Sequence, residues 1–171
     1  MMRQALMRPL DVANGPGIRV SLFVSGCRHA CPGCFNDIFQ DFSYGTPWSS
    51  KLEQALVAAL DAPLITGLSL LGGEPFQNTE GLLPLLRRLR DHWEEQGLQR
   101  DVWVWSGYTF EELLQDPEKR ALLSLCDVLV DGRFLLEEKN LSLPFCGSMN
   151  QRVLDVELSL QQQKPVLIGP L

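Results

Sequence analysis

The chain has 171 residues, of which 45% are hydrophobic and 21% are charged. This composition excludes the class of disordered segments, because such segments lack the apolar area needed to offset chain entropy. The length predicts one domain, residues 1–171, with a sizeable core. The 15 Lys and Arg residues against 21 Asp and Glu residues give a net charge of −6. A general nucleic-acid binder needs a basic surface, so we expect no nucleic acid as a partner.

No uninterrupted apolar stretch approaches the roughly 18 to 20 residues that cross a bilayer. Arg3 and Arg8 interrupt the N-terminal segment, where a signal peptide would need its apolar core. We therefore expect no membrane contact and a cytoplasmic protein.

The first predicted strand covers residues 18–24, a nearly continuous run of β-branched and aromatic residues that is typical of a buried parallel strand. Ser50 and Glu53 have the spacing of a capping box, and leucines then repeat at every fourth residue, which predicts a helix. Residues 64–71 form a second predicted strand, which ends at a Gly-Gly pair.

A second amphipathic helix is predicted from apolar residues at positions 82, 85, 86, 89 and 93, with Pro84 in its first turn. Residues 102–105 form the third predicted strand. Trp103 and Trp105 alternate there with valines, and we expect one indole to pack on the inner side of the barrel and the other to meet the helices.

Thr109 and Glu112 form a second predicted capping box. Residues 128–130 form the fourth predicted strand, and residues 152–156 form a weaker fifth strand. Strands that alternate with helices predict βαβ units, which build a parallel sheet with helices packed outside it. A complete β/α barrel usually needs about 200 residues or more. The expected fold is therefore α/β, a partial and open parallel β/α barrel.

Unusual residues follow each of the four main predicted strands, at the carboxyl edge where parallel folds bind ligands. In chain order these segments are Cys27–Cys34, Gly72–Pro75, Ser106–Tyr108 and Asp131–Gly132.

Three of the five cysteines, Cys27, Cys31 and Cys34, lie in one short segment, here named the cysteine loop (residues 26–36). In a reducing compartment such a cluster favours metal ligation over disulfides. A structural zinc site and an electron-transfer [4Fe–4S] cluster each take four protein ligands, so three thiols leave one coordination position open for a substrate.

Two other interpretations of the cysteine loop stay open. Cys31 and Cys34 have the spacing of a thioredoxin-like redox pair, and His29 is a possible fourth ligand of a zinc site. No function is assigned to the other two cysteines, although Cys126 precedes a buried strand and is expected to be a small core residue. Cys146 lies beside a segment that could contact a partner.

The Cys-x-x-x-Cys-x-x-Cys spacing after the first strand, with Gly-Gly-Glu-Pro after the second, resembles the radical S-adenosylmethionine (SAM) superfamily. Residues 14–19, Asn-Gly-Pro-Gly-Ile-Arg, are similar to a segment of the enzymes that activate glycyl-radical proteins. Within that group the chain resembles the family of activating proteins of anaerobic (class III) ribonucleoside-triphosphate reductases, from about residue 11 to about residue 156. The segments that carry this closer resemblance are residues 22–27, 31–36, 102–108, 128–134 and 147–152.

The resemblance implies that Cys27, Cys31 and Cys34 bind three irons of a [4Fe–4S] cluster and that SAM chelates the fourth. Cleavage of SAM by the reduced cluster would then yield the radical that takes a hydrogen atom from one glycine of the large reductase subunit. That subunit is the implied partner, together with a low-potential electron donor such as flavodoxin. No residue is expected to act as an acid or base, because the cluster and SAM carry the chemistry.

The resemblance also implies the SAM contacts. Gly72, Gly73 and Glu74 would receive the methionine end, since glycines allow close backbone approach and a carboxylate accepts from an ammonium group. Gly33 stands where many superfamily members carry an aromatic residue.

Phe35, directly after Cys34, is the expected substitute for that aromatic residue, unless it belongs to the core. Asp131 is expected either near SAM or a cation, or as a turn residue before Gly132. Two other functions remain possible: activation of a different glycyl-radical enzyme, and a non-catalytic zinc-binding interaction module. The absence of an insert for additional clusters argues against the longer activating enzymes.

Overall fold

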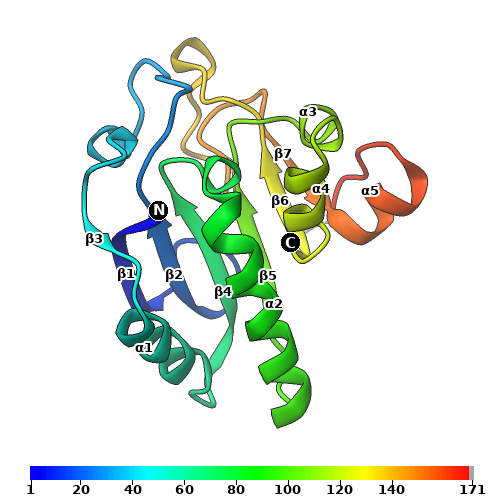
Figure 1. Cartoon of the computed structure of the whole chain (residues 1–171). Coiled ribbons are helices and arrows are strands. Elements are labelled where there is room, and N and C mark those ends of the chain that lie inside the picture. Colours follow the sequence, from blue (N-terminus) through cyan, green and yellow to red (C-terminus); the bar gives the residue numbers. More distant parts are fainter. Residues whose placement is uncertain (170–171) are drawn as a thin grey trace.

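Seven strands form one open sheet in the order β3-β1-β2-β4-β5-β6-β7 in the computed structural model, which describes residues 1–169 (Figure 1). The fold is mixed α/β. The strands are β1 (Arg3–Asp11), β2 (Ile18–Val24), β3 (Thr46–Pro47), β4 (Ile65–Gly72), β5 (Asp101–Trp105), β6 (Val128–Asp131) and β7 (Arg152–Asp155). The α-helices are α1 (Ser50–Leu60), α2 (Thr79–Gln96), α3 (Phe110–Leu114), α4 (Pro117–Leu123) and α5 (Val156–Gln162), and short 3₁₀ helices cover Asp37–Gln40, Pro75–Gln77 and Leu136–Glu138.

The four central strands β2, β4, β5 and β6 are parallel, as the alternation of strands and helices predicts. The expectation of an entirely parallel sheet is wrong at the edges, because β1, β3 and β7 pair antiparallel with their neighbours. β1 is absent from the sequence prediction. It is rich in polar residues, it is mostly half-buried or exposed, and its pairing shifts register around Pro9, as a proline within a strand requires.

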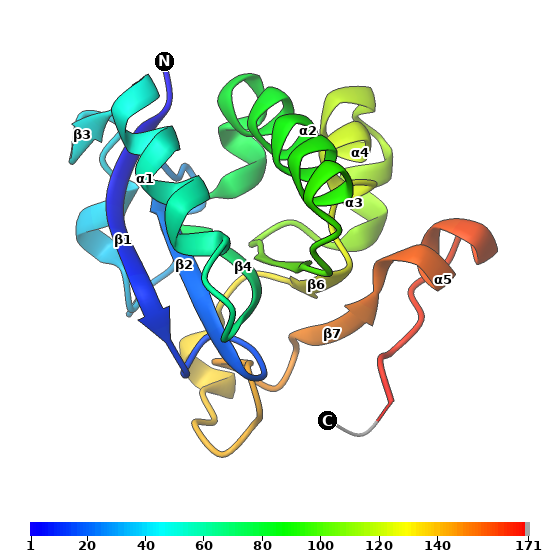
Figure 2. The same ribbon diagram turned by 90° about the horizontal axis from the view of Figure 1, so that it is seen from below.

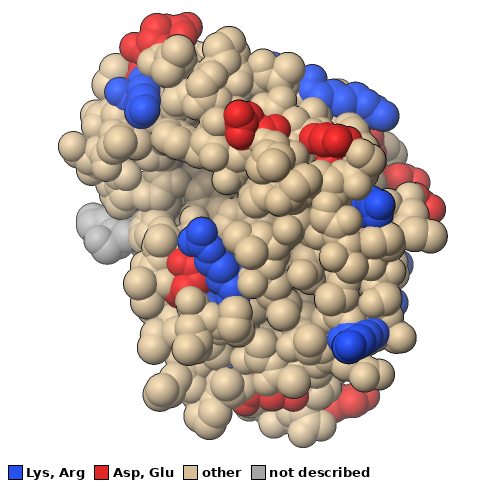
Figure 3. Space-filling model, turned by 90° about the vertical axis from the view of Figure 1, so that its left-hand side faces the viewer, with Lys and Arg blue, Asp and Glu red and all other residues tan. Residues whose placement is uncertain are grey.

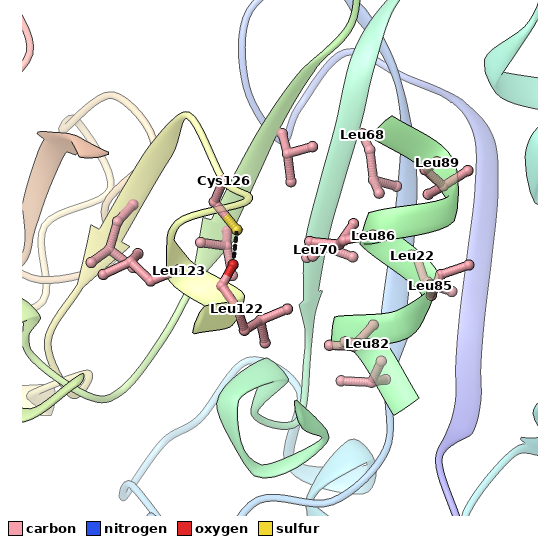
Figure 4. Close-up of a cluster of buried hydrophobic side chains, with 14 of the residues drawn as sticks. Leu22, Leu68, Leu70, Leu82, Leu85, Leu86, Leu89, Leu122, Leu123 and Cys126 are labelled. Carbon is pink, nitrogen blue, oxygen red and sulfur yellow. Dashed lines mark hydrogen bonds between the residues drawn. The ribbon is translucent and has the colours of Figure 1, made fainter. Parts of the chain in front are cut away.

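Helices α1, α2, α3 and α4 lie on one face of the sheet (Figure 2). The core between them and the strands is built mainly of leucine (Figure 4). All five apolar positions that predicted the second helix are buried in α2, because they fall on a single helical stripe. Cys126 is buried in this core, where its thiol donates to the Leu122 carbonyl at 3.5 Å, so its prediction as a core residue is confirmed.

Two predicted helix starts need correction. Ser49, not Ser50, caps α1, and its side chain accepts from the backbone N–H of Leu52. Pro84 lies in the second turn of α2 and not in the first, because the helix begins at Thr79. The prolyl ring removes one backbone donor there, and the packed leucine stripe holds the helix together. The capping box at the start of α3 is confirmed in both of its hydrogen bonds.

The two tryptophans of β5 lie on the same face of the sheet, contrary to expectation. Residues two apart on a strand point to one side, and the ring centroids of Trp103 and Trp105 are 5.8 Å apart. Val102 and Val104 face the helices instead. Trp103 is buried in a second, smaller core with Val128 and Val130.

Charged side chains are scattered in ones and twos over the side of the molecule in Figure 3, with no patch of a single sign on that face. Among residues 1–169, no helix combines the length and the apolar character that a membrane span requires.

Candidate functional site

The carboxyl ends of the parallel strands border a cavity of about 460 Å³. The cysteine loop and the segment 133–147 lie together at this end of the sheet, at the top of Figure 1. The predicted site residues that line the cavity are Cys27, Cys31, Cys34, Phe35, Gly72, Gly73 and Glu74. Gly33 and Asp131 do not line it.

Two backbone hydrogen bonds shape the start of the cysteine loop: Gly26 N–H donates to the Phe39 carbonyl at 2.8 Å, and Cys27 N–H donates to the Gln40 carbonyl at 3.0 Å. Further along, Cys34 N–H donates to the Cys31 carbonyl at 3.2 Å. Pro32 and Gly33 occupy the middle of that turn, where proline fixes φ and glycine supplies the positive φ of 72°. The positive φ favours glycine at position 33.

The three thiols of the cysteine loop are half-buried and free. Burial raises the pKa of Cys27 to about 11 and also raises the pKa of Cys31. Since the thiolate is the form that ligates iron, metal binding must displace these protons.

The three thiols of the cysteine loop fit an iron–sulfur cluster that keeps one iron open. Within residues 1–169, no three His, Cys, Asp or Glu side chains lie close enough together to hold one ion. Each cysteine of a [4Fe–4S] cluster binds a different iron, so cluster ligands lie farther apart than the ligands of one zinc ion. Cys27, Cys31 and Cys34 line one cavity from a single loop, which is the donor set that such a cluster takes.

Gly72 and Gly73 bring the end of β4 against the start of the cysteine loop. A Cβ atom at Gly73 would lie 2.4 Å from the Gly26 carbonyl oxygen, and one at Gly72 would lie 2.3 Å from the Val24 carbonyl oxygen. Backbone hydrogen bonds of 2.8 Å join Gly73 N–H to Val24 and Glu74 N–H to Gly26. The glycine pair is therefore required for this close approach, whatever it binds.

Glu74 is 1% exposed and accepts four hydrogen bonds within the protein. Its Oε1 atom accepts from Phe76 N–H at 3.0 Å and from Ser106 Oγ at 2.9 Å. Its Oε2 atom accepts from Gly107 N–H at 2.8 Å and contacts His29 Nε2 at 3.1 Å. The Glu74 side chain thus joins the loops that follow β2, β4 and β5.

His29 has both ring nitrogens engaged. Nε2 contacts Glu74, and Nδ1 contacts Arg133 Nε at 3.2 Å. Neither nitrogen is free for a metal ion, so the structure does not support His29 as a fourth zinc ligand. The sequence shows a His between two cysteines, but no local pattern connects it with residues 45 and 104 positions away.

Phe35 is not a core residue, because 57% of it is exposed. Its ring lines the cavity, lies 5.0 Å from the Phe134 ring, and has the Lys139 ammonium 5.3 Å from its centroid. Phe35 is therefore part of the cavity wall, and its contact with a ligand stays a prediction.

Asp131 is 1% exposed, and its carboxylate is hydrogen-bonded within the protein. Its carboxylate accepts from the Phe110 N–H at the start of α3 at 2.7 Å, and from Arg152 Nε at 2.9 Å. The hydrogen bonds of Arg152 to Asp131 and then to Glu111 raise the pKa of Arg152. These contacts favour the structural alternative, a turn residue before Gly132, over a place beside SAM or a cation.

Sequence reasoning missed the segment 133–147 as part of the site. Phe134, Leu141, Phe145 and Cys146 line the cavity from it, and Trp105 Nε1 donates to the Phe145 carbonyl at 2.8 Å. Burial raises the pKa of the Cys146 thiol. The run has few apolar repeats, so no periodic pattern marks it as a wall of the cavity.

A family model described as a 4Fe-4S single cluster domain matches residues 13–154. An anaerobic ribonucleoside-triphosphate reductase-activating protein of Haemophilus influenzae is 43% identical over 147 residues, which cover 84% of this chain and 91% of the relative. The chain belongs to the family of anaerobic ribonucleoside-triphosphate reductase-activating proteins. The family member of Escherichia coli K12 is 41% identical over 149 residues (85% and 93% of the two chains), and that of bacteriophage T4 is 37% identical over 149 residues (85% and 88%).

Proposed function

We propose that this chain is a radical SAM activating enzyme that generates the glycyl radical on an anaerobic ribonucleoside-triphosphate reductase. The observation that supports this function is the convergence of three thiols from one loop and the Gly72–Glu74 segment on one cavity at the carboxyl edge of the sheet. The open seven-stranded sheet, with helices on one face, is compatible with the partial barrel of that superfamily.

Cys27, Cys31 and Cys34 would each hold one iron of a [4Fe–4S] cluster, which leaves the fourth iron open to the amino and carboxylate groups of SAM. When bound and reduced, the cluster supplies the electron that cleaves SAM to methionine and the radical that takes a hydrogen atom from the target glycine. The chain supplies binding, orientation and shielding from water.

Gly72 and Gly73 would offer backbone groups to the methionine end of SAM, because no side chain stands between them and the cavity. Glu74 already accepts four donors from the protein. Its contribution would therefore include holding the loops that bind SAM. Phe35 would pack against the adenine ring from the rim of the cavity.

The large reductase subunit is the proposed partner, because the relatives carry that activity in their names. A low-potential donor such as flavodoxin would supply the electron, and the reaction would take place in the cytoplasm.

The test is an anaerobic assay. The protein is reconstituted with iron and sulfide, reduced, and mixed with SAM, with and without the large reductase subunit. We expect 5′-deoxyadenosine, more of it with the reductase present, and a glycyl radical signal on the reductase. Product without any effect of the reductase would indicate another glycyl-radical target. A protein that binds only zinc and forms no product would refute the proposal.

A further inference from the structure

We propose that His29 is a positioning residue, whose imidazole clamps the cysteine loop onto Glu74. The clamp fixes the spacing between the thiols and the Gly72–Glu74 segment, so this inference rests on the proposed function of that site. His29 lies two residues after Cys27 and two residues before Cys31. A restrained His29 side chain therefore restrains the backbone between two cluster ligands.

The His29 side chain is inserted among three other loops and is only 6% exposed. It contacts the carboxylate of Glu74 at 3.1 Å and packs edge-on against the Tyr108 ring, with centroids 4.6 Å apart. A Cβ atom at Gly107 would lie 2.5 Å from His29 Cδ2. The imidazole thus fills a closely fitted space between the loops that follow β4 and β5.

The hydrogen bonds of His29 specify one tautomer. Arg133 Nε can only donate, so His29 Nδ1 must accept its hydrogen bond. The ring proton then resides on Nε2, which donates to Glu74 Oε2. Because Glu74 also accepts from Ser106 and Gly107, the clamp connects the cysteine loop to a rigid, buried group rather than to a mobile side chain.

The backbone beside His29 requires such a restraint. Ala30 has a φ of 51°, a left-handed conformation that residues with a Cβ rarely adopt. Conformations of this kind persist only where surrounding contacts hold them. A second contact acts in the same place, because Arg28 N–H donates to the Gln77 side chain at 2.9 Å.

Four variants test the clamp in the reconstituted protein. His29→Ala removes it. His29→Gln keeps an amide donor near the position of Nε2. Gly107→Ala crowds the imidazole without removing any hydrogen-bonding group. His92→Ala is the matched control. His92 is the other histidine of the chain, lies in α2 and contacts Asp61 at the end of α1.

The first measurement is amide hydrogen exchange of residues 26–34, which depends on neither SAM nor turnover. We expect exchange at least about tenfold faster in His29→Ala and Gly107→Ala, with wild-type rates in His92→Ala and most of the protection restored in His29→Gln. The second measurement is a SAM titration monitored through the electron paramagnetic resonance spectrum of the reduced cluster. We expect half-saturation at about 10- to 100-fold higher SAM in His29→Ala, the range typical of lost support for metal ligands.

Unchanged exchange in both His29→Ala and Gly107→Ala would overturn the clamp, whatever SAM does. If His29→Ala binds no iron, the hydrogen exchange and the SAM titration of Gly107→Ala test the clamp in its place. Faster exchange with an unchanged SAM titration would overturn the positioning role and leave only a local structural one. A wild-type protein whose spectrum does not respond to SAM would refute the proposed function, while the exchange rates would still test the clamp.

Discussion

Gly73→Ala should push the end of β4 away from the start of the cysteine loop. The added Cβ would lie 2.4 Å from the Gly26 carbonyl oxygen and 2.7 Å from the Phe39 carbonyl oxygen, both of them backbone atoms that cannot turn aside. Ordinary contact begins at 3.4 Å, so the end of β4 would have to move by about 1.0 Å, the difference between 3.4 and 2.4 Å. Gly73 has no positive φ, so the backbone conformation itself tolerates alanine.

A displacement of this size breaks the 2.8 Å hydrogen bond from Glu74 N–H to the Gly26 carbonyl. Overpacking costs about 1–3 kcal/mol, and the lost hydrogen bond adds about 0.5–1.5 kcal/mol. We therefore expect the free energy of unfolding to fall by about 2–4 kcal/mol. In a domain of this size the melting temperature would fall by roughly 5–15 °C.

The assay is urea unfolding under anaerobic conditions, on protein purified without iron so that cofactor binding adds nothing to the transition. Gly169→Ala is the control, because a Cβ atom there meets nothing within 4 Å. If Gly73→Ala stays within about 0.5 kcal/mol of the wild type, the loops do not approach each other as described, and the explanation of the glycine pair fails.

Three further predictions concern single side chains of the site and its surroundings. Cys34→Ala should lose most of its iron and sulfide after reconstitution, whereas Cys146→Ala should keep the wild-type content; equal losses would contradict the ligand assignment. Arg152→Ala should lower the free energy of unfolding by roughly 3 kcal/mol in urea, because Asp131 stays buried without its cation; a loss below about 1 kcal/mol would refute this. The hydrogen bond from Arg152 also lowers the pKa of Glu111 below its ordinary value of 4.5. The ion pair between Glu111 and Arg152 therefore stabilises the fold fully above pH 4.5, and this stabilisation is lost as the pH falls and Glu111 takes up a proton. The loss of unfolding free energy in Arg152→Ala should be smaller at pH 3 than at pH 7, which urea unfolding at both pH values would measure.

The central strands could be predicted because each is a short apolar run that ends in a polar or glycine-containing turn, and burial on both faces removes any need for alternation. β1 could not be predicted in the same way. The sequence of β1 mixes Arg, Gln and Pro with apolar residues, so it shows neither a helical nor a strand period. The partner strand β2 begins seven residues after the end of β1. Pairing with a neighbouring strand, not its own propensity, makes β1 a strand.

The orientation of the β5 tryptophans could have been predicted from the sequence alone. Trp103 and Trp105 are two residues apart, which on any strand places them on one face. The expectation that they point to opposite faces was wrong, because on this strand it is the tryptophans and the valines that point to opposite faces. Their shared face contacts Phe145, and that contact ties the segment 133–147 to the sheet.

The sequence encodes the ligands of the site and the groups that hold those ligands in different ways. Cys27, Cys31 and Cys34 lie within eight residues of one another, so their spacing alone predicts a common ligand. The groups around His29 lie 45 and 104 positions away, and only the parallel sheet brings them together. A correct prediction of the sheet limits the possible partners of His29 to the loops after β4, β5 and β6. It cannot select among them, because that choice depends on close packing such as that at Gly107, where an added Cβ would lie 2.5 Å from His29 Cδ2.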